Sequence, residues 1–134
     1  MDDQVKAKAP PMFGNLEDWH TDDTLTTEGA PLNLNNGRVI LCRRAGTRNR
    51  EFMVAVAELD TEDEVARYDV YARHVVAGWS GINDAEGNPI PYTPEACVAL
   101  FQYAPEVFDL VLMFAAQRAN YRGQKLAEDG EAVK

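Results

Sequence analysis

The residues that could hold a metal ion or catalyse a reaction are spread thinly along this chain of 134 residues. The acidic turn Asp84–Asn88 invites a calcium interpretation, because Gly87 can be aligned with the invariant glycine of an EF-hand loop. The alignment then puts Ile82 and Thr93 at the first and last ligand positions, where oxygen-rich side chains are required. We therefore expect no calcium site in this turn.

The sequence also contains no motif that is typical of zinc binding or of catalysis. The two histidines and two cysteines lack zinc-ligand spacing; they are His20, His74, Cys42 and Cys97. The chain has no Gly-rich phosphate loop, nucleophile elbow or HExxH motif. Carboxylate pairs such as Asp84 and Glu86 remain the alternative, but in a chain with 22 acidic residues they arise by chance and usually serve in caps and turns. We expect no catalytic residue, no metal, no cofactor and no enzymatic activity.

The charge of the chain is negative and unevenly distributed. A formal net charge of −9 argues against nucleic acid as the main partner, because phosphate contacts need a basic surface. Residues 36–50 nevertheless contain five arginines and no acidic residue. These arginines either contact an acidic protein surface or a second copy of the chain, or belong to a solvated strand and turn balanced by nearby carboxylates. The second interpretation is favoured.

The spacing of the cysteines and the length of the apolar runs indicate the cellular compartment. No signal peptide is recognisable, and no apolar run reaches the roughly 18 residues that a membrane helix needs. Cys42 falls in a strand pattern and Cys97 on a helix face, so both are expected to be reduced core residues. We expect a soluble cytosolic protein without membrane contact.

The pattern of apolar and turn residues predicts an α+β domain that is predominantly helical. A β-hairpin is expected over residues 32–41, with a type I′ turn at Asn36-Gly37. About four helices follow: residues 50–59, a helix from a capping box at Thr61 to a terminal glycine at Gly78, residues 94–103, and residues 105–122. Residues 31–126 form the predicted globular domain, residues 1–30 a flexible segment, and residues 127–134 a charged tail. Within the flexible segment, a small apolar cluster is expected; it comprises Met12, Phe13, Leu16 and Trp19.

The turn-rich stretch from Gly78 to Glu95 is the most informative part of the chain. It is expected to form a rigid connector between two helices, with Trp79 as its buried apolar anchor. Gly87 supplies a positive φ, the prolines force an extended path, and Thr93 caps the following helix with Pro94 in its first turn. The predicted structural residues of this connector are Trp79, Gly87, Pro89, Pro91, Thr93 and Pro94.

This connector resembles the small tail assembly chaperones of long-tailed, lambda-like bacteriophages. The resemblance rests on the strings VVAGW at residues 75–79, DAEGNP at 84–89 and PYTPE at 91–95, and it covers residues 36–126. It implies a protein that coats the tape measure protein, recruits tail tube subunits and forms homo-oligomers. It also implies action in the host cytoplasm and absence from the mature virion. The alternative is a structural virion component, such as a minor tail or head–tail connector protein.

The last long helix is unusually apolar between Val107 and Ala116, where Asp109 is the single interruption. It is either the central core helix or a helix with one face covered by another molecule. Asp109 marks the solvent side together with positions 113 and 116. The expected buried face is centred on Val107, Val111, Phe114 and Ala115. The expected contacts to a partner or a second copy are Phe108, Leu110 and Leu112, extended by Leu100 and Phe101.

Overall fold

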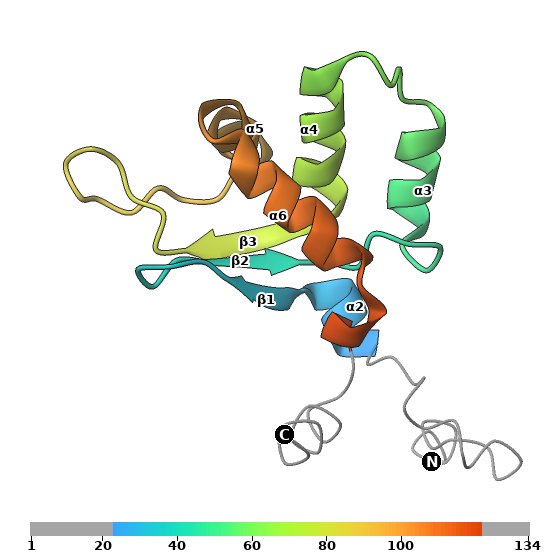
Figure 1. Ribbon diagram of the computed structural model, residues 1–134, viewed down its shortest axis with the longest axis horizontal. Coiled ribbons are helices and arrows are strands. Elements are labelled where there is room, and N and C mark those ends of the chain that lie inside the picture. Colours follow the sequence, from blue (N-terminus) through green and yellow to red (C-terminus); the bar gives the residue numbers. More distant parts are fainter. Residues whose placement is uncertain (1–22, 122–134) are drawn as a thin grey trace, which may run out of the picture.

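A three-stranded antiparallel sheet with the strand order β1-β2-β3 supports the fold (Figure 1). The computed structural model describes residues 23–121. The strands are β1 (Ala30–Asn33), β2 (Val39–Cys42) and β3 (Val76–Ser80). The helices are α2 (Asp23–Glu28), α3 (Arg50–Ala57), α4 (Glu64–His74), α5 (Pro94–Tyr103) and α6 (Pro105–Ala116), followed by a 3₁₀ turn, η2 (Arg118–Tyr121). The predicted α+β class with an N-terminal hairpin is confirmed.

The predicted hairpin forms around Asn36 and Gly37. Their φ values are 63° and 76°, the pair of positive angles that a type I′ turn requires. Leu32 pairs with Ile40 and Asn33 with Val39, so β1 and β2 leave the turn in antiparallel register. The local signal was sufficient here because turn type and register are fixed by adjacent residues.

The third strand was not predicted. The sequence suggested a helix continuing to Gly78, but the helix ends at His74 and Val76–Ser80 pairs with β2. Ile40 faces Trp79 and Leu41 faces Gly78 in this pairing. The expectation of Gly78 as a helix-terminal residue is therefore wrong, because pairing with a strand some 35 residues away outweighs the local helical pattern.

Helices α4, α5 and α6 lie over one face of the sheet, and α3 stands beside α4 (Figure 1). The caps set where α3 and α4 begin. Asn49 accepts a hydrogen bond from the Phe52 N–H, and Asp63 accepts one from the Ala66 N–H. The predicted capping box at Thr61 is wrong, because Asp63 caps the helix instead.

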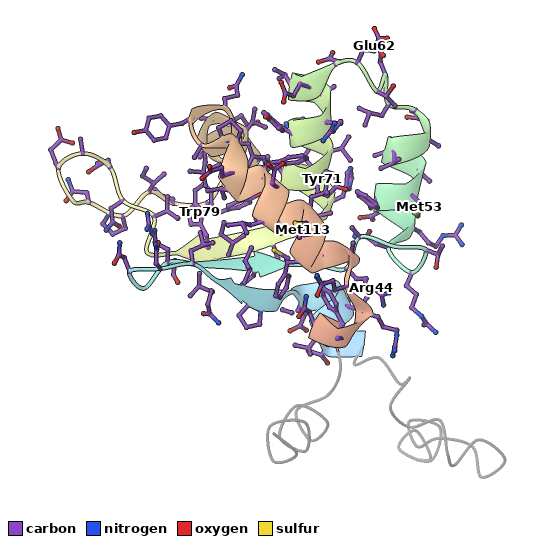
Figure 2. All side chains as sticks on the ribbon, in the orientation of Figure 1. Arg44, Met53, Glu62, Tyr71, Trp79 and Met113 are labelled. Atoms are coloured by element: carbon purple, nitrogen blue, oxygen red, sulfur yellow. The ribbon has the colours of Figure 1, made fainter. Side chains whose placement is uncertain are left out.

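Aromatic rings of α3, α4, α5 and α6 pack against one another in the core, and Figure 2 labels Tyr71 of α4 among them. Phe108 contacts Tyr68, Tyr71 and Phe101, with ring centroids 4.8, 5.1 and 5.1 Å apart. Phe52 of α3 joins the cluster through Tyr71 at 5.2 Å. Val111 and other fully buried side chains complete the core; they include Ile40, Val75, Val76, Cys42, Cys97 and Tyr121.

The folded part begins before the predicted boundary at residue 31. Residues 23–28 form α2, and Thr26 and Ala30 are 5% and 1% exposed. The predicted apolar cluster of Met12, Phe13, Leu16 and Trp19 lies outside the described residues, as does the charged tail at 127–134. Between residues 23 and 121, no single helix is long and apolar enough to span a membrane; α5 and α6 meet that criterion only when counted together, and they are bent by 115°.

Candidate protein-binding groove

The connector between β3 and α5 is a compact turn held by Asp84. The Asp84 Oδ1 accepts hydrogen bonds from the backbone N–H groups of Glu86 and Asn88 at 3.0 and 2.9 Å. The Ile90 N–H donates to the Ile82 carbonyl at 2.9 Å, which closes the base of the turn. Gly87 has a φ of 90°, as the sequence predicts. Asp84 thus serves as a turn-forming acceptor.

Trp79 and Tyr92 fix this turn to the domain. The Trp79 Nε1–H donates to the Ile90 carbonyl at 2.8 Å, and its ring meets Tyr92 edge to face at 4.9 Å between centroids. The Tyr92 hydroxyl donates to the Ala72 carbonyl at the end of α4. Trp79 anchors the connector as expected, but it is half-buried and belongs to β3.

The predicted start of α5 is confirmed. The Thr93 hydroxyl accepts a hydrogen bond from the Ala96 N–H at 3.0 Å, and Pro94 occupies the first turn. Pro89 lies opposite Asn83 in an isolated bridge, and Pro91 continues the extended path towards α5. The prolines therefore direct the chain from the turn to the helix cap.

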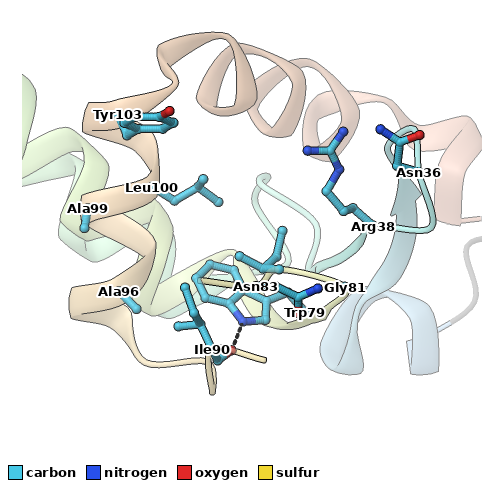
Figure 3. Close-up of a pocket in the computed structure, with 11 residues that line it drawn as sticks. Asn36, Arg38, Trp79, Gly81, Asn83, Ile90, Ala96, Ala99, Leu100 and Tyr103 are labelled. Atoms are coloured by element: carbon cyan, nitrogen blue, oxygen red, sulfur yellow. Dashed lines mark hydrogen bonds between the residues drawn. The ribbon is translucent and has the colours of Figure 1, made fainter. Parts of the chain in front are cut away.

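An open groove of about 600 Å³ lies between α5, the connector and the β1–β2 turn (Figure 3). Trp79 and Ile90 lie at one side, joined by their hydrogen bond. The side chains of α5 form a wall, and Arg38 lies across from them (Figure 3). The full lining comprises Asn36, Arg38, Trp79, Gly81, Ile82, Asn83, Ile90, Ala96, Ala99, Leu100 and Tyr103.

Tyr103 and Arg38 bring a hydroxyl and a guanidinium group to the lining of the groove. Tyr103 is 88% exposed, which is an unusual position for a large aromatic side chain. Arg38 donates to the carbonyl and to the side-chain oxygen of Asn35, both neutral acceptors. Within residues 23–121, Arg38 has no carboxylate partner. Tyrosine, tryptophan and arginine around an apolar surface are the residue types that dominate protein interfaces.

Gly81 brings the two sides of the groove together. Its φ is 80°, and a Cβ atom placed on it would lie 2.6 Å from the Gly37 carbonyl oxygen. That distance is too short for a real contact, so the connector can approach the hairpin turn only with glycine at this position. No local sequence signal reveals this contact, because Gly37 and Gly81 are distant along the chain.

The structure separates the five predicted contact residues into different environments. Phe101 and Phe108 are 0% and 2% exposed, so the expectation that they contact a partner is corrected: both are core residues. Leu112 is partly buried against the core, and Leu100 lines the groove. Leu110 is 46% exposed on α6. Arg38, Ile82, Ile90 and Tyr103 were not expected to form a site.

The thiols of Cys42 and Cys97 are buried and protonated at neutral pH. Desolvation by burial raises the pKa of Cys42 and of Cys97 to about 12. Both side chains are fully buried in the core, so the thiolate forms that would act as nucleophiles are suppressed. In the part of the chain that the structure describes, no group of three or more His, Cys, Asp or Glu side chains is placed to hold a metal ion.

These features define a small α+β domain with an open, mostly apolar groove and an arginine at its rim. A family model for the YdaY prophage protein matches residues 36–132, which is most of the chain. The chain belongs to this family and is a phage-derived protein. Neither the curated proteins nor the solved structures contain a significant match.

Proposed function

We propose that this prophage protein is a tail assembly chaperone, a non-enzymatic protein that binds the tape measure protein and helps to recruit tail tube subunits. The observation that carries the proposal is the groove between α5 and the connector, with Tyr103 exposed at its rim. The proposal is also supported by the prophage family and by the resemblance of the connector to such chaperones.

The chemistry of the groove specifies the segment that it would bind. Leu100, Ile82 and Ile90 offer apolar surface, whose burial contributes about 25 cal/mol per Å². Arg38 offers a guanidinium to a carboxylate, and paired hydrogen bonds of this kind fix orientation. The expected ligand is therefore an apolar segment of the tape measure protein that carries one acidic residue.

Co-expression with the tape measure and tail tube proteins of the same prophage, followed by affinity capture, tests this proposal. Tyr103→Ser should weaken capture of the tape measure protein about tenfold or more, as for a residue that dominates an interface. Its exposure means that the change should leave the melting temperature unaltered. Val54→Ser is the matched control, because Val54 is a 58% exposed apolar residue on α3 outside the groove.

The proposal places the protein in the host cytoplasm during assembly and excludes it from finished particles. Mass spectrometry of purified virions checks the second point. Recovery of the protein from purified virions in stoichiometric amounts would favour a structural virion component instead. Equal capture of the tape measure protein by wild type and the Tyr103→Ser variant would show that the groove is not the binding site.

A further inference from the structure

A second pocket, of about 530 Å³, is lined by residues of the segment that leads from β2 into α3 and of the end of α4. This segment follows β2, whereas the groove borders the β1–β2 turn that precedes it. Arginines from three segments surround the second pocket: Arg43 after β2, Arg48 and Arg50 around the start of α3, and Arg73 in the last turn of α4. The other lining residues are Thr26, Thr27, Asn49, Glu51 and His74.

The backbone around this pocket is held in place by Asn49. The Asn49 Nδ2 donates to the Arg44 carbonyl at 3.0 Å and to the His74 carbonyl at 2.8 Å, so it ties the loop before α3 to the end of α4. The Arg43 N–H donates to the Val75 carbonyl at 2.6 Å. The arginines therefore project from a fixed frame, which lowers the entropic cost of binding a ligand.

Among the described residues, one of the four arginines that line this pocket is paired with carboxylates. Arg73 is paired with Asp69 at 2.9 Å and with Glu95 at 3.2 Å. The Arg43 Nε–H donates to the neutral Thr27 carbonyl at 2.8 Å. Within residues 23–121, Arg43, Arg48 and Arg50 form no ion pair. In the described part of the chain, Glu51 is the one carboxylate in the lining, so these lining residues carry a net positive charge.

We propose that this arginine-lined pocket binds an acidic segment of a partner protein. Carboxylates suit guanidinium groups because two parallel hydrogen bonds can form to each. A nucleic acid fits less well, because its dense phosphates would extend past the pocket along a protein whose net charge is −9. The proposal uses residues separate from those of the groove and does not depend on the chaperone assignment.

Fluorescence polarisation with a labelled peptide of alternating Glu and Ser tests the proposal on the full-length protein. A Gln–Ser peptide of the same length and a single-stranded DNA oligonucleotide are the comparison probes. We expect saturable binding of the Glu–Ser peptide that weakens as salt rises, and none of the Gln–Ser peptide. Arg48→Gln and Arg50→Gln together should weaken this binding about tenfold. Both residues are exposed, so the melting temperature should not change.

The control is Arg67→Gln, which removes a guanidinium of α4 that lines neither the groove nor the arginine pocket and should leave the affinity for the Glu–Ser peptide unchanged. Equal loss with Arg67→Gln would overturn the proposal, because binding would then follow total charge rather than the pocket. Absence of Glu–Ser binding, or tighter binding of the DNA, would overturn it as well. A failure of tape measure capture would leave this result untouched.

Discussion

Gly81 shows how much of the groove depends on one missing side chain. A Cβ on this residue would meet the Gly37 carbonyl oxygen at 2.6 Å and the Arg38 Cα at 3.0 Å. Relief of that overlap would move the connector away from the hairpin turn. Ile82 of the connector and Arg38 beside the turn would then lie farther apart, and these two residues line two sides of the groove. The shape of the groove is thus coupled to a backbone contact rather than to its own lining side chains.

Three glycine-to-alanine variants separate the effect of steric overlap on stability from the effect of a positive φ. Gly81→Ala should lower the free energy of unfolding most, because it combines a positive φ with steric overlap. Gly87→Ala has a φ of 90° but free space around it, so about 1–2 kcal/mol is expected from backbone strain alone. Gly78→Ala meets neither obstacle and should be neutral or slightly stabilising. Urea denaturation followed by tryptophan fluorescence measures the order, and equal values for Gly81→Ala and Gly78→Ala would contradict the contact.

Helix caps in this fold differ in how far their effect reaches. Asp63 accepts one backbone hydrogen bond at the start of α4. Asn49 accepts the equivalent bond for α3 and also donates to two carbonyls, including that of His74 at the end of α4. Asn49 therefore couples one helix to the next, and the arginine pocket is built on this connection.

This difference predicts unequal costs for two alanine substitutions. Asp63→Ala should cost about 1 kcal/mol, the usual value for a lost N-cap. Asn49→Ala should cost about 2 kcal/mol or more, because two further carbonyls lose their partner. Thermal unfolding of both variants checks the comparison. A cost for Asn49→Ala no larger than for Asp63→Ala would show that the bonds to Arg44 and His74 contribute little.

Elements whose signals are local can be predicted from the sequence. The hairpin turn at Asn36-Gly37, the cap at Thr93 and the positive φ of Gly87 are each set by a few adjacent residues. Strand β3 has no such local signal, because it exists through its pairing with β2. On α6 the solvent side at Asp109 and Met113 was predicted correctly, since one charge fixes the helical phase.

The candidate site was harder to predict than the fold, because its parts meet only after folding. Phe108 was expected at the surface but lies in the core, where it contacts aromatic rings of α4 and α5. The groove joins the hairpin turn, the end of β3, the connector and α5. Pairwise distances between such remote segments are not encoded in any short pattern.

At the scale of the whole molecule, stability should fall in alkaline solution. Burial raises the pKa of Cys42 and Cys97 from 9.0 to about 12, and also raises the pKa of Tyr92 and Tyr121. The unfolded chain therefore loses protons first, so this stabilisation is complete below pH 9.0 and is lost as the pH rises towards about 12. Each unit of pKa difference corresponds to about 1.4 kcal/mol.

Urea midpoints measured between neutral pH and pH about 11 check this expectation. They should be constant near neutrality and decrease steadily above pH 9.0. The double variant Cys42→Ala, Cys97→Ala should show a shallower decrease, because the tyrosines alone then contribute. An unchanged slope in that variant would assign the alkaline loss of stability to other groups.

Self-association is also a property of the whole molecule, and α6 supplies its remaining candidate residues. Leu110 and Met113 are 46% and 57% exposed on the outer side of the helix. If copies associate here, Leu110→Glu should abolish oligomers while leaving the circular dichroism unchanged, because Leu110 is exposed. Sedimentation velocity provides the readout. Leu112→Glu is the contrasting variant: Leu112 packs against the core, so this change should lower the melting temperature.

The elements at the two ends of the described region, α2 and η2, contact each other. Residues 23 and 121 therefore lie in neighbouring elements. Domains whose ends lie close together tolerate circular permutation. A circular permutant with a linker across this junction and new ends at the exposed residues 61–62 between α3 and α4 would keep the groove and the arginine pocket intact.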